Sequence, residues 1–252
     1  MTDNLTTDEL RETIVHHEWN QFQHTNNEGG RAACQGNWPV FHQMRLAQFL
    51  TWERPLLSSY AADLDEADHV GRNLVTEKYG RMMASTAPDD FAKNIEPYIP
   101  RLTESRVSRQ EQVIAQQVAW AADFRSRYPK LGEAMRVLTT AEDAPTTTSF
   151  ETYLRGELGT YSDMTFDLYE AMIRERADTT PQHNITEETL LNTVQLGGFS
   201  TLDEAEAAQR WRCAHHNYRL NRPQNASVVH VASAATTMMM PAARRAPMMS
   251  AR

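Results

Sequence analysis

The chain of 252 residues is poor in cysteine, in long apolar runs and in alternating β-branched residues, and each shortage excludes a class of protein. Its two cysteines, Cys34 and Cys213, lie far apart without metal-type spacing, which gives no disulfide framework and suits a reducing compartment. No apolar stretch approaches the roughly 18 residues of a membrane span. The opening residues MTDNLTTDELRE are polar and acidic, whereas a signal peptide is cationic and then apolar. We therefore expect a cytoplasmic protein with no membrane partner.

Positive charge is also in short supply over most of the chain. The 33 acidic residues outnumber the 25 Lys and Arg, for a net charge of -8. An acidic protein lacks the basic surface that nonspecific binding to nucleic acid requires, so we predict no nucleic-acid partner. Residues 222–252 differ, because they contain four arginines and no Asp or Glu and are biased to Ala, Met and Pro. We predict one domain over 1–216 and a disordered tail over 217–252.

Apolar residues recur at helical spacing along most of the chain. Thr6 followed by Glu9 is a capping box, which predicts the start of a helix. Pro39 falls in the first turn of a second helix, where proline is tolerated. Breaks are expected at Gly and Pro positions, Pro88 among them. The sequence therefore predicts an all-α, bundle-like domain. The expected helices cover about 7–25, a segment from 38, and 55–69, 72–86, 104–126, 131–142, 149–175, 187–197 and 202–216.

Several charged residues occupy positions where these helices require apolar ones. Glu18 falls in the stripe of Leu10, Ile14 and Phe22. The other three are Arg45, Lys78 and Glu157, each bracketed by apolar residues of its own helix. An isolated buried charge is costly, so these side chains must find partners, and the cheapest solution pairs them with each other.

We therefore predict a polar cluster inside the bundle, formed by Glu18, Arg45, Lys78 and Glu157. Three tyrosines are the expected hydrogen-bond partners: Tyr79, Tyr153 and Tyr161. One interpretation is a buried salt-bridge network that binds nothing. The other is a ligand site, because unlike charges that converge from separate helices are how bundle interiors hold ligands and shift pKa values.

The stretch NNEGGRAACQGN, residues 26–37, lies between two helical segments. It lacks the spacing and the preceding strand of a phosphate-binding loop. The simpler interpretation is that its glycines end the first helix. Arg31 and Gln35 could nevertheless turn back toward Glu18, while Cys34 is typical of a small buried residue. A di-iron bundle needs two ExxH elements and this chain has one, so we predict no metal site.

On the helix expected over 72–86, Glu77 and Arg81 have the spacing of an i,i+4 ion pair, which is usually a solvated face. Because Lys78 is on the same turn, a second interpretation is that Lys78 and Arg81 grip a carboxylate or phosphate of a ligand.

Five segments together carry a resemblance to a known family. They are EW-x2-F, NNEGGRAACQ, GRNL-x2-EKYGRMM, SFETYLRGEL-x2-YS and LLNTVQLGGFSTLDEAE, in one order between about residues 14 and 211. In these five segments the chain resembles bacterial domain-of-unknown-function family 4125. The resemblance implies that a set of polar positions belongs to the site, namely Glu18, Arg31, Gln35, Glu77, Lys78, Tyr79, Arg81, Tyr153, Arg155 and Glu157. It also implies a functional context with a nucleotidyltransferase-like protein, because some relatives are fused or adjacent to such a domain.

Two hypotheses for function follow. The first is an enzyme that acts on a small anionic metabolite by general acid–base chemistry, as a lyase, hydratase or transferase. Lys78 and Arg31 would hold the anion, Glu18 or Glu157 would move the proton, and a tyrosine would donate to the developing negative charge. The second is a noncatalytic binding or accessory module for a nucleotidyltransferase-like partner. We expect no cofactor, because no phosphate cup accompanies Lys78 for pyridoxal phosphate.

Overall fold

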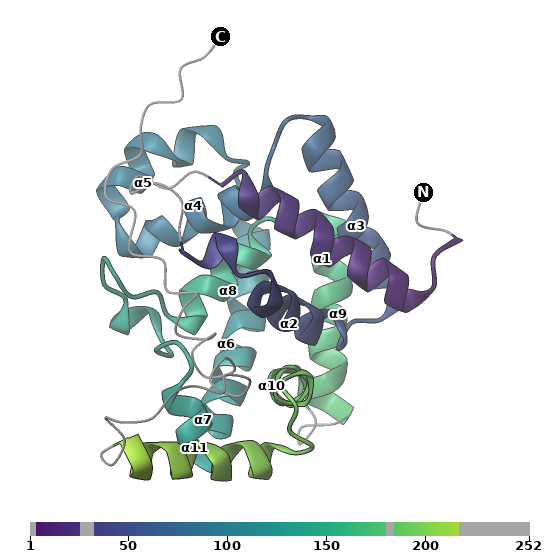
Figure 1. Cartoon of the computed structure of the whole chain (residues 1–252). Helices are drawn as coiled ribbons and strands as arrows, with labels where there is room; N and C mark the ends of the chain where they lie inside the picture. The colour runs from purple at the N-terminus through teal and green to yellow at the C-terminus, as the bar shows by residue number, and fades with distance from the viewer. Residues whose placement is uncertain (1–3, 26–32, 180–183, 217–252) are drawn as a thin grey trace.

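The protein is all-helical, as predicted. The computed structural model describes residues 4–25, 33–179 and 184–216, and within these ranges it contains eleven α-helices and no β-strand (Figure 1). The predicted tail over 217–252 lies outside the described residues. In chain order the α-helices are α1 (Thr7–Gln23), α2 (Trp38–Phe49), α3 (Arg54–His69), α4 (Leu74–Thr86), α5 (Pro88–Asn94), α6 (Glu104–Arg127), α7 (Pro129–Glu133), α8 (Phe150–Leu158), α9 (Asp163–Thr179), α10 (Ile185–Leu196) and α11 (Leu202–His216).

The first helix, α1, begins where its capping box predicts. At α1 the Thr6 hydroxyl accepts from the Glu9 backbone N–H at 3.2 Å, and the Glu9 carboxylate accepts from the Thr6 backbone N–H at 2.7 Å, which satisfies two exposed donors of the first turn. Leu10 and Phe22 on this helix are fully buried, and Glu18 is buried with them. The apolar stripe read from the sequence is therefore the face that packs into the protein.

The single helix expected over 149–175 is wrong, because the chain breaks into α8 and α9. The break is stable because its backbone groups find partners. Arg106 of α6 donates to the Leu158 carbonyl at 3.0 Å, and the Ser162 hydroxyl accepts from the Thr165 backbone N–H at 3.2 Å at the start of α9. The break places Tyr161 in the turn between the two helices.

The helix expected over 131–142 is also wrong. In its place are the short α7 and a 3-10 turn at Thr140–Glu142. The Glu206 carboxylate of α11 accepts from the backbone N–H groups of Lys130 and Leu131, at 3.1 and 2.8 Å, and so caps α7 from a distant segment. The break expected at Pro88 does separate α4 from the next segment, but Pro88 also stands in the first turn of an additional helix, α5.

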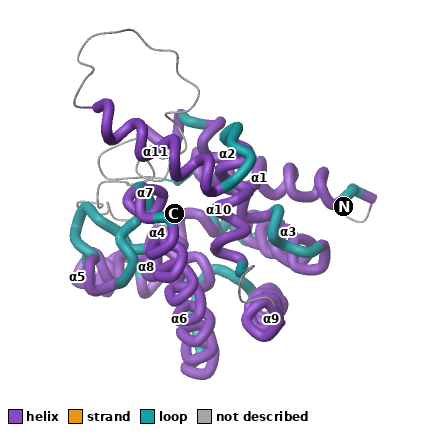
Figure 2. The backbone as a smooth tube through the Cα atoms, turned by 90° about the horizontal axis from the view of Figure 1, so that it is seen from below, coloured by secondary structure: helices purple, strands orange, loops and turns teal. Residues whose placement is uncertain are grey.

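Two hydrophobic clusters organise the described residues. The larger one joins α1, α2, α3, α4, α6, α8, α9 and the start of α10. The smaller one joins the end of α6 with α7, α10 and α11, and includes Phe124, Leu131 and Val194. Figure 1 shows α7 and α11 together at one end of the molecule, with α10 between them and α2, and Figure 2 also shows α7 close to α11. None of the described helices combines the length and apolarity needed to cross a membrane.

Candidate functional site

Arg45 of α2 is at the centre of a buried network of charges, which we call the ion cluster. Its Nε donates to Glu18 Oε2 at 2.5 Å and its Nη2 donates to Glu18 Oε1 at 2.6 Å, so the two planar groups meet through parallel hydrogen bonds. Its Nη1 lies 3.2 Å from Glu157 Oε1. The guanidinium thus joins α1 to α8, and all three side chains are at most 5% exposed.

Lys78 of α4 completes the ion cluster from the other side of Glu157. Its Nζ donates to Glu157 Oε2 at 2.8 Å and to the Tyr153 hydroxyl at 2.5 Å. Close packing of α4 on α8 makes this possible, because a Cβ added to Gly156 would lie 2.7 Å from the Lys78 carbonyl oxygen. Glycine therefore permits the approach of the two backbones.

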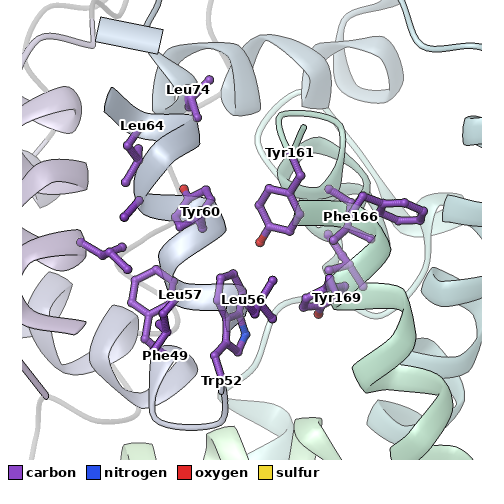
Figure 3. Close-up of a cluster of buried hydrophobic side chains, with 14 of the residues drawn as sticks. Phe49, Trp52, Leu56, Leu57, Tyr60, Leu64, Leu74, Tyr161, Phe166 and Tyr169 are labelled. Carbon is purple, nitrogen blue, oxygen red and sulfur yellow. The ribbon is translucent and has the colours of Figure 1, made fainter. Parts of the chain in front are cut away.

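Three neutral side chains donate further hydrogen bonds to carboxylate oxygen atoms that already accept from Arg45. Gln48 Nε2 donates to Glu157 Oε1 at 2.7 Å, and the Tyr161 hydroxyl donates to the same atom at 3.1 Å. The Tyr60 hydroxyl of α3 donates to Glu18 Oε1 at 2.7 Å. Figure 3 shows Tyr60 and Tyr161 in the same aromatic group as Trp52 and Tyr169. The ion cluster is thus bordered by an aromatic core.

Opposite charges balance within the ion cluster, and this sets its protonation states. Burial raises the pKa of Glu157, but the charges of Arg45 and Lys78 and the hydrogen bonds from Lys78 and Gln48 outweigh it, and the pKa lies well below its usual range. Burial lowers the pKa of Arg45, yet the charges of Glu157 and Glu18 raise it well above its ordinary value. Two carboxylates are therefore matched by two cations.

Two cavities adjoin the ion cluster, and Arg45, Tyr153 and Glu157 line both. The smaller cavity has a volume of about 20 Å³, room for about one water molecule, and also reaches Glu18 and Lys78. The larger one has a volume of about 200 Å³. It lies between the two hydrophobic clusters, and most of its lining is apolar. Its apolar lining comprises Met44, Met135, Phe150, Leu154, Ile185 and Leu190.

The structure thus brings together Glu18, Arg45, Lys78, Tyr153, Glu157 and Tyr161 of the residues expected from the sequence. Tyr79 lines the smaller cavity and packs against Phe22. Tyr60 was not expected, although a hydroxyl within the buried stripe of α3 was a usable signal. Gln48 was not expected at the site either.

Other expected site residues lie elsewhere. Gln35 donates to the carbonyls of Phe22 and Thr25, at 2.7 and 2.9 Å, and so caps the end of α1. Arg155 pairs with Glu111 of α6 at 2.7 Å and with Glu151. Neither residue lines a cavity beside the ion cluster. Arg31 falls outside the described residues.

The expected pair of Glu77 and Arg81 is wrong. Glu77 accepts two hydrogen bonds from Arg72, at 2.7 and 2.8 Å, and Arg81 donates to the Pro100 carbonyl at 2.7 Å. Arg81 also packs on the turn at Gly159. Arg81 lines neither of the two cavities, whereas Lys78 lines the smaller one, and the binding of one anion by both cations stays a prediction.

The described residues contain no group of three or more His, Cys, Asp or Glu side chains that could hold a metal ion. Searches of curated proteins and of solved structures found no match to the chain. A family model does match, over residues 8–207, which includes every residue of the ion cluster. The chain therefore belongs to the family described as "Protein of unknown function (DUF4125)".

Proposed function

We propose that the protein binds a small molecule in the larger cavity, with the molecule's apolar part among the aliphatic and aromatic side chains and its polar end against the ion cluster. The observation that carries this proposal is the shared lining: Arg45, Tyr153 and Glu157 border a cavity of about 200 Å³ that is otherwise largely apolar. A concave apolar site with a few convergent polar groups is the usual form of a small-molecule site.

The geometry also favours an enzymatic form of this proposal, in which Tyr153 is the polar group that meets the reacting atom. Its hydroxyl accepts from the Lys78 ammonium at 2.5 Å, so its own proton is directed to another acceptor. The nearby Lys78 ammonium would stabilise negative charge that develops on a ligand oxygen that accepts a hydrogen bond from this hydroxyl. This supports the tyrosine role expected from the sequence.

Glu157 is less suited to the acid–base role that the sequence suggested. Its pKa lies well below the usual range, so it is ionised at neutral pH and cannot serve there as a general acid. Both of its oxygens already accept hydrogen bonds from Arg45 and Lys78, and Gln48 and Tyr161 donate to Oε1 as well. We therefore propose that Glu157 holds Arg45 and Lys78 in place. The cytoplasmic location and the nucleotidyltransferase-like partner stay predictions.

Binding is tested by native mass spectrometry for a retained ligand and by titration with Nile red, a neutral apolar dye. Thr189 borders the cavity from α10, so Thr189→Trp should fill the space and weaken dye binding roughly tenfold or more. Met164→Trp is the matched control, because Met164 is 65% exposed on α9 and lies outside the cavity. The proposal is wrong if neither method detects binding to the wild-type protein, or if the two variants bind the dye equally.

A further inference from the structure

Gln117 of α6 brings an unused hydrogen-bond donor to the larger cavity. The side chain is buried and lines the cavity. Its Oε1 accepts from the Tyr169 hydroxyl at 3.0 Å. Its Nε2 has no hydrogen-bond partner among the described residues. A buried donor without a partner is costly, and a bound acceptor would recover that cost.

Two further residues bring donor groups to the cavity wall, beside the hydroxyls of Thr186 and Thr189, which can both donate and accept. Tyr153 directs its proton away from Lys78, which already donates to it. Arg136 brings a guanidinium whose Cζ lies 4.7 Å from the centre of the Tyr153 ring. By contrast, the Glu157 carboxylate is the acceptor for Arg45 and Lys78. A ligand in this cavity therefore meets donor groups, and one of them, Gln117 Nε2, has no partner among the described residues.

Charge points in the same direction. The charged side chains that line the cavity are two guanidinium groups, of Arg45 and Arg136, and one carboxylate, of Glu157. A carboxylate matches guanidinium and amide donors in both charge and geometry. An alkylammonium group would bring more donors to a wall that already has an excess of them.

From these observations we infer that the cavity selects an apolar chain that ends in a carboxylate, and that Gln117 and Arg136 determine this selectivity. The inference rests on the proposed function and names the class of molecule that the same cavity takes. The apolar side chains hold the hydrocarbon part, and the donors hold the carboxylate oxygens.

Three eight-carbon probes test this selectivity by isothermal titration calorimetry: octanoate, octanol and octylamine. Octanoate should bind to the wild-type protein at least roughly tenfold more tightly than octylamine, with octanol between them. If octanoate, octanol and octylamine bind equally, the inference is wrong and the proposed function stands. If none of the three binds while Nile red does, the inference is wrong and the proposed function stands, whereas failure of Nile red and of native mass spectrometry as well refutes the proposed function.

Gln117→Glu sharpens the test, because it keeps the acceptor for Tyr169 and replaces the donor with a carboxylate oxygen. Octanoate affinity should fall roughly tenfold or more, and the preference for octanoate over octylamine should shrink or reverse. Gln112→Glu is the control, since it adds the same charge to an exposed position of α6 and should leave the preference unchanged. Arg136→Gln takes the place of Gln117→Glu if the latter does not fold. It should lower octanoate affinity and leave octanol affinity unchanged. Selectivity identical to wild type in the variant that folds overturns the inference.

Discussion

Arg45 and Glu18 face each other across α1 and α2 through two parallel hydrogen bonds, of 2.5 and 2.6 Å, with both side chains at most 5% exposed. Arg45 also contacts Glu157 at 3.2 Å. One guanidinium is therefore the shared partner of both buried carboxylates.

Arg45→Met should be the most destabilising single change in the ion cluster. The variant leaves Glu18 and Glu157 short of their common cation, and breaking a buried pair in this way costs roughly 3–5 kcal/mol. The free energy of unfolding, measured with urea, checks this value. Arg174→Met is the control, because Arg174 is 70% exposed in its pair with Glu170 and should change stability by less than about 1 kcal/mol. Equal losses in the two variants would contradict the central role of Arg45.

Lys78→Met should cost less than Arg45→Met. Glu157 keeps Arg45, Gln48 and Tyr161 as donors when the ammonium is removed, so we expect a loss of about 1.5–3 kcal/mol. The same urea experiment ranks the two variants. A loss as large as that of Arg45→Met would show that Glu157 depends on Lys78 rather than on the guanidinium.

The stability supplied by Glu157 should disappear in acid. Its folded pKa is lowered from the ordinary value of 4.5, so its contribution is present above about pH 4.5 and is lost as the pH falls through the folded pKa. The difference in unfolding free energy between the wild-type protein and Glu157→Gln isolates this effect. It should be greatest near pH 7 and shrink below about pH 4.5. A difference that stays constant from neutral pH into acid would refute the ion pairing of Glu157.

Three buried tyrosines should resist ionisation until the protein unfolds. Burial, with nearby negative charge, raises the pKa of Tyr60, Tyr161 and Tyr169 above the ordinary value of 10.0. Their neutral forms stabilise the fold below that pH, and this stability is lost as the pH rises above it, because the unfolded chain ionises first. Tyrosinate absorbance should therefore rise in two phases, the second together with loss of helical circular dichroism. Complete ionisation of all tyrosines with the helical signal intact would argue against the burial of the aromatic group beside the ion cluster.

Gly156→Ala should separate α8 from α4. The new Cβ would lie 2.7 Å from the Lys78 carbonyl oxygen and 2.9 Å from Met82 Cγ, and such overpacking costs roughly 1–3 kcal/mol, although alanine has the better helix propensity. Thermal unfolding measures the effect. Gly36→Ala is the control, because a Cβ there has no heavy atom within 4 Å. If Gly156→Ala matches or exceeds the wild-type stability, the two backbones do not approach this closely.

The sequence by itself determined the all-helical class and the inward orientation of four charges. A period of 3.6 residues fixes which side chains share a helix face, so Glu18 must point where Leu10 and Phe22 point. It equally places Tyr153 and Glu157, four residues apart, on one face of α8. The same geometry puts Arg155 roughly 200° away from Glu157, which is why Arg155 faces α6 and not the ion cluster.

Only the tertiary structure decided which partners meet and where space is left. Tyr60 reaches Glu18 because α3 packs beside α1, and the caps on Leu158 and α7 come from Arg106 and Glu206 on distant helices. The larger cavity exists because the two hydrophobic clusters meet without filling the volume between α2, α6, α8 and α10. The periodicity of one helix contains none of these relationships, because each depends on how separate helices are placed against one another.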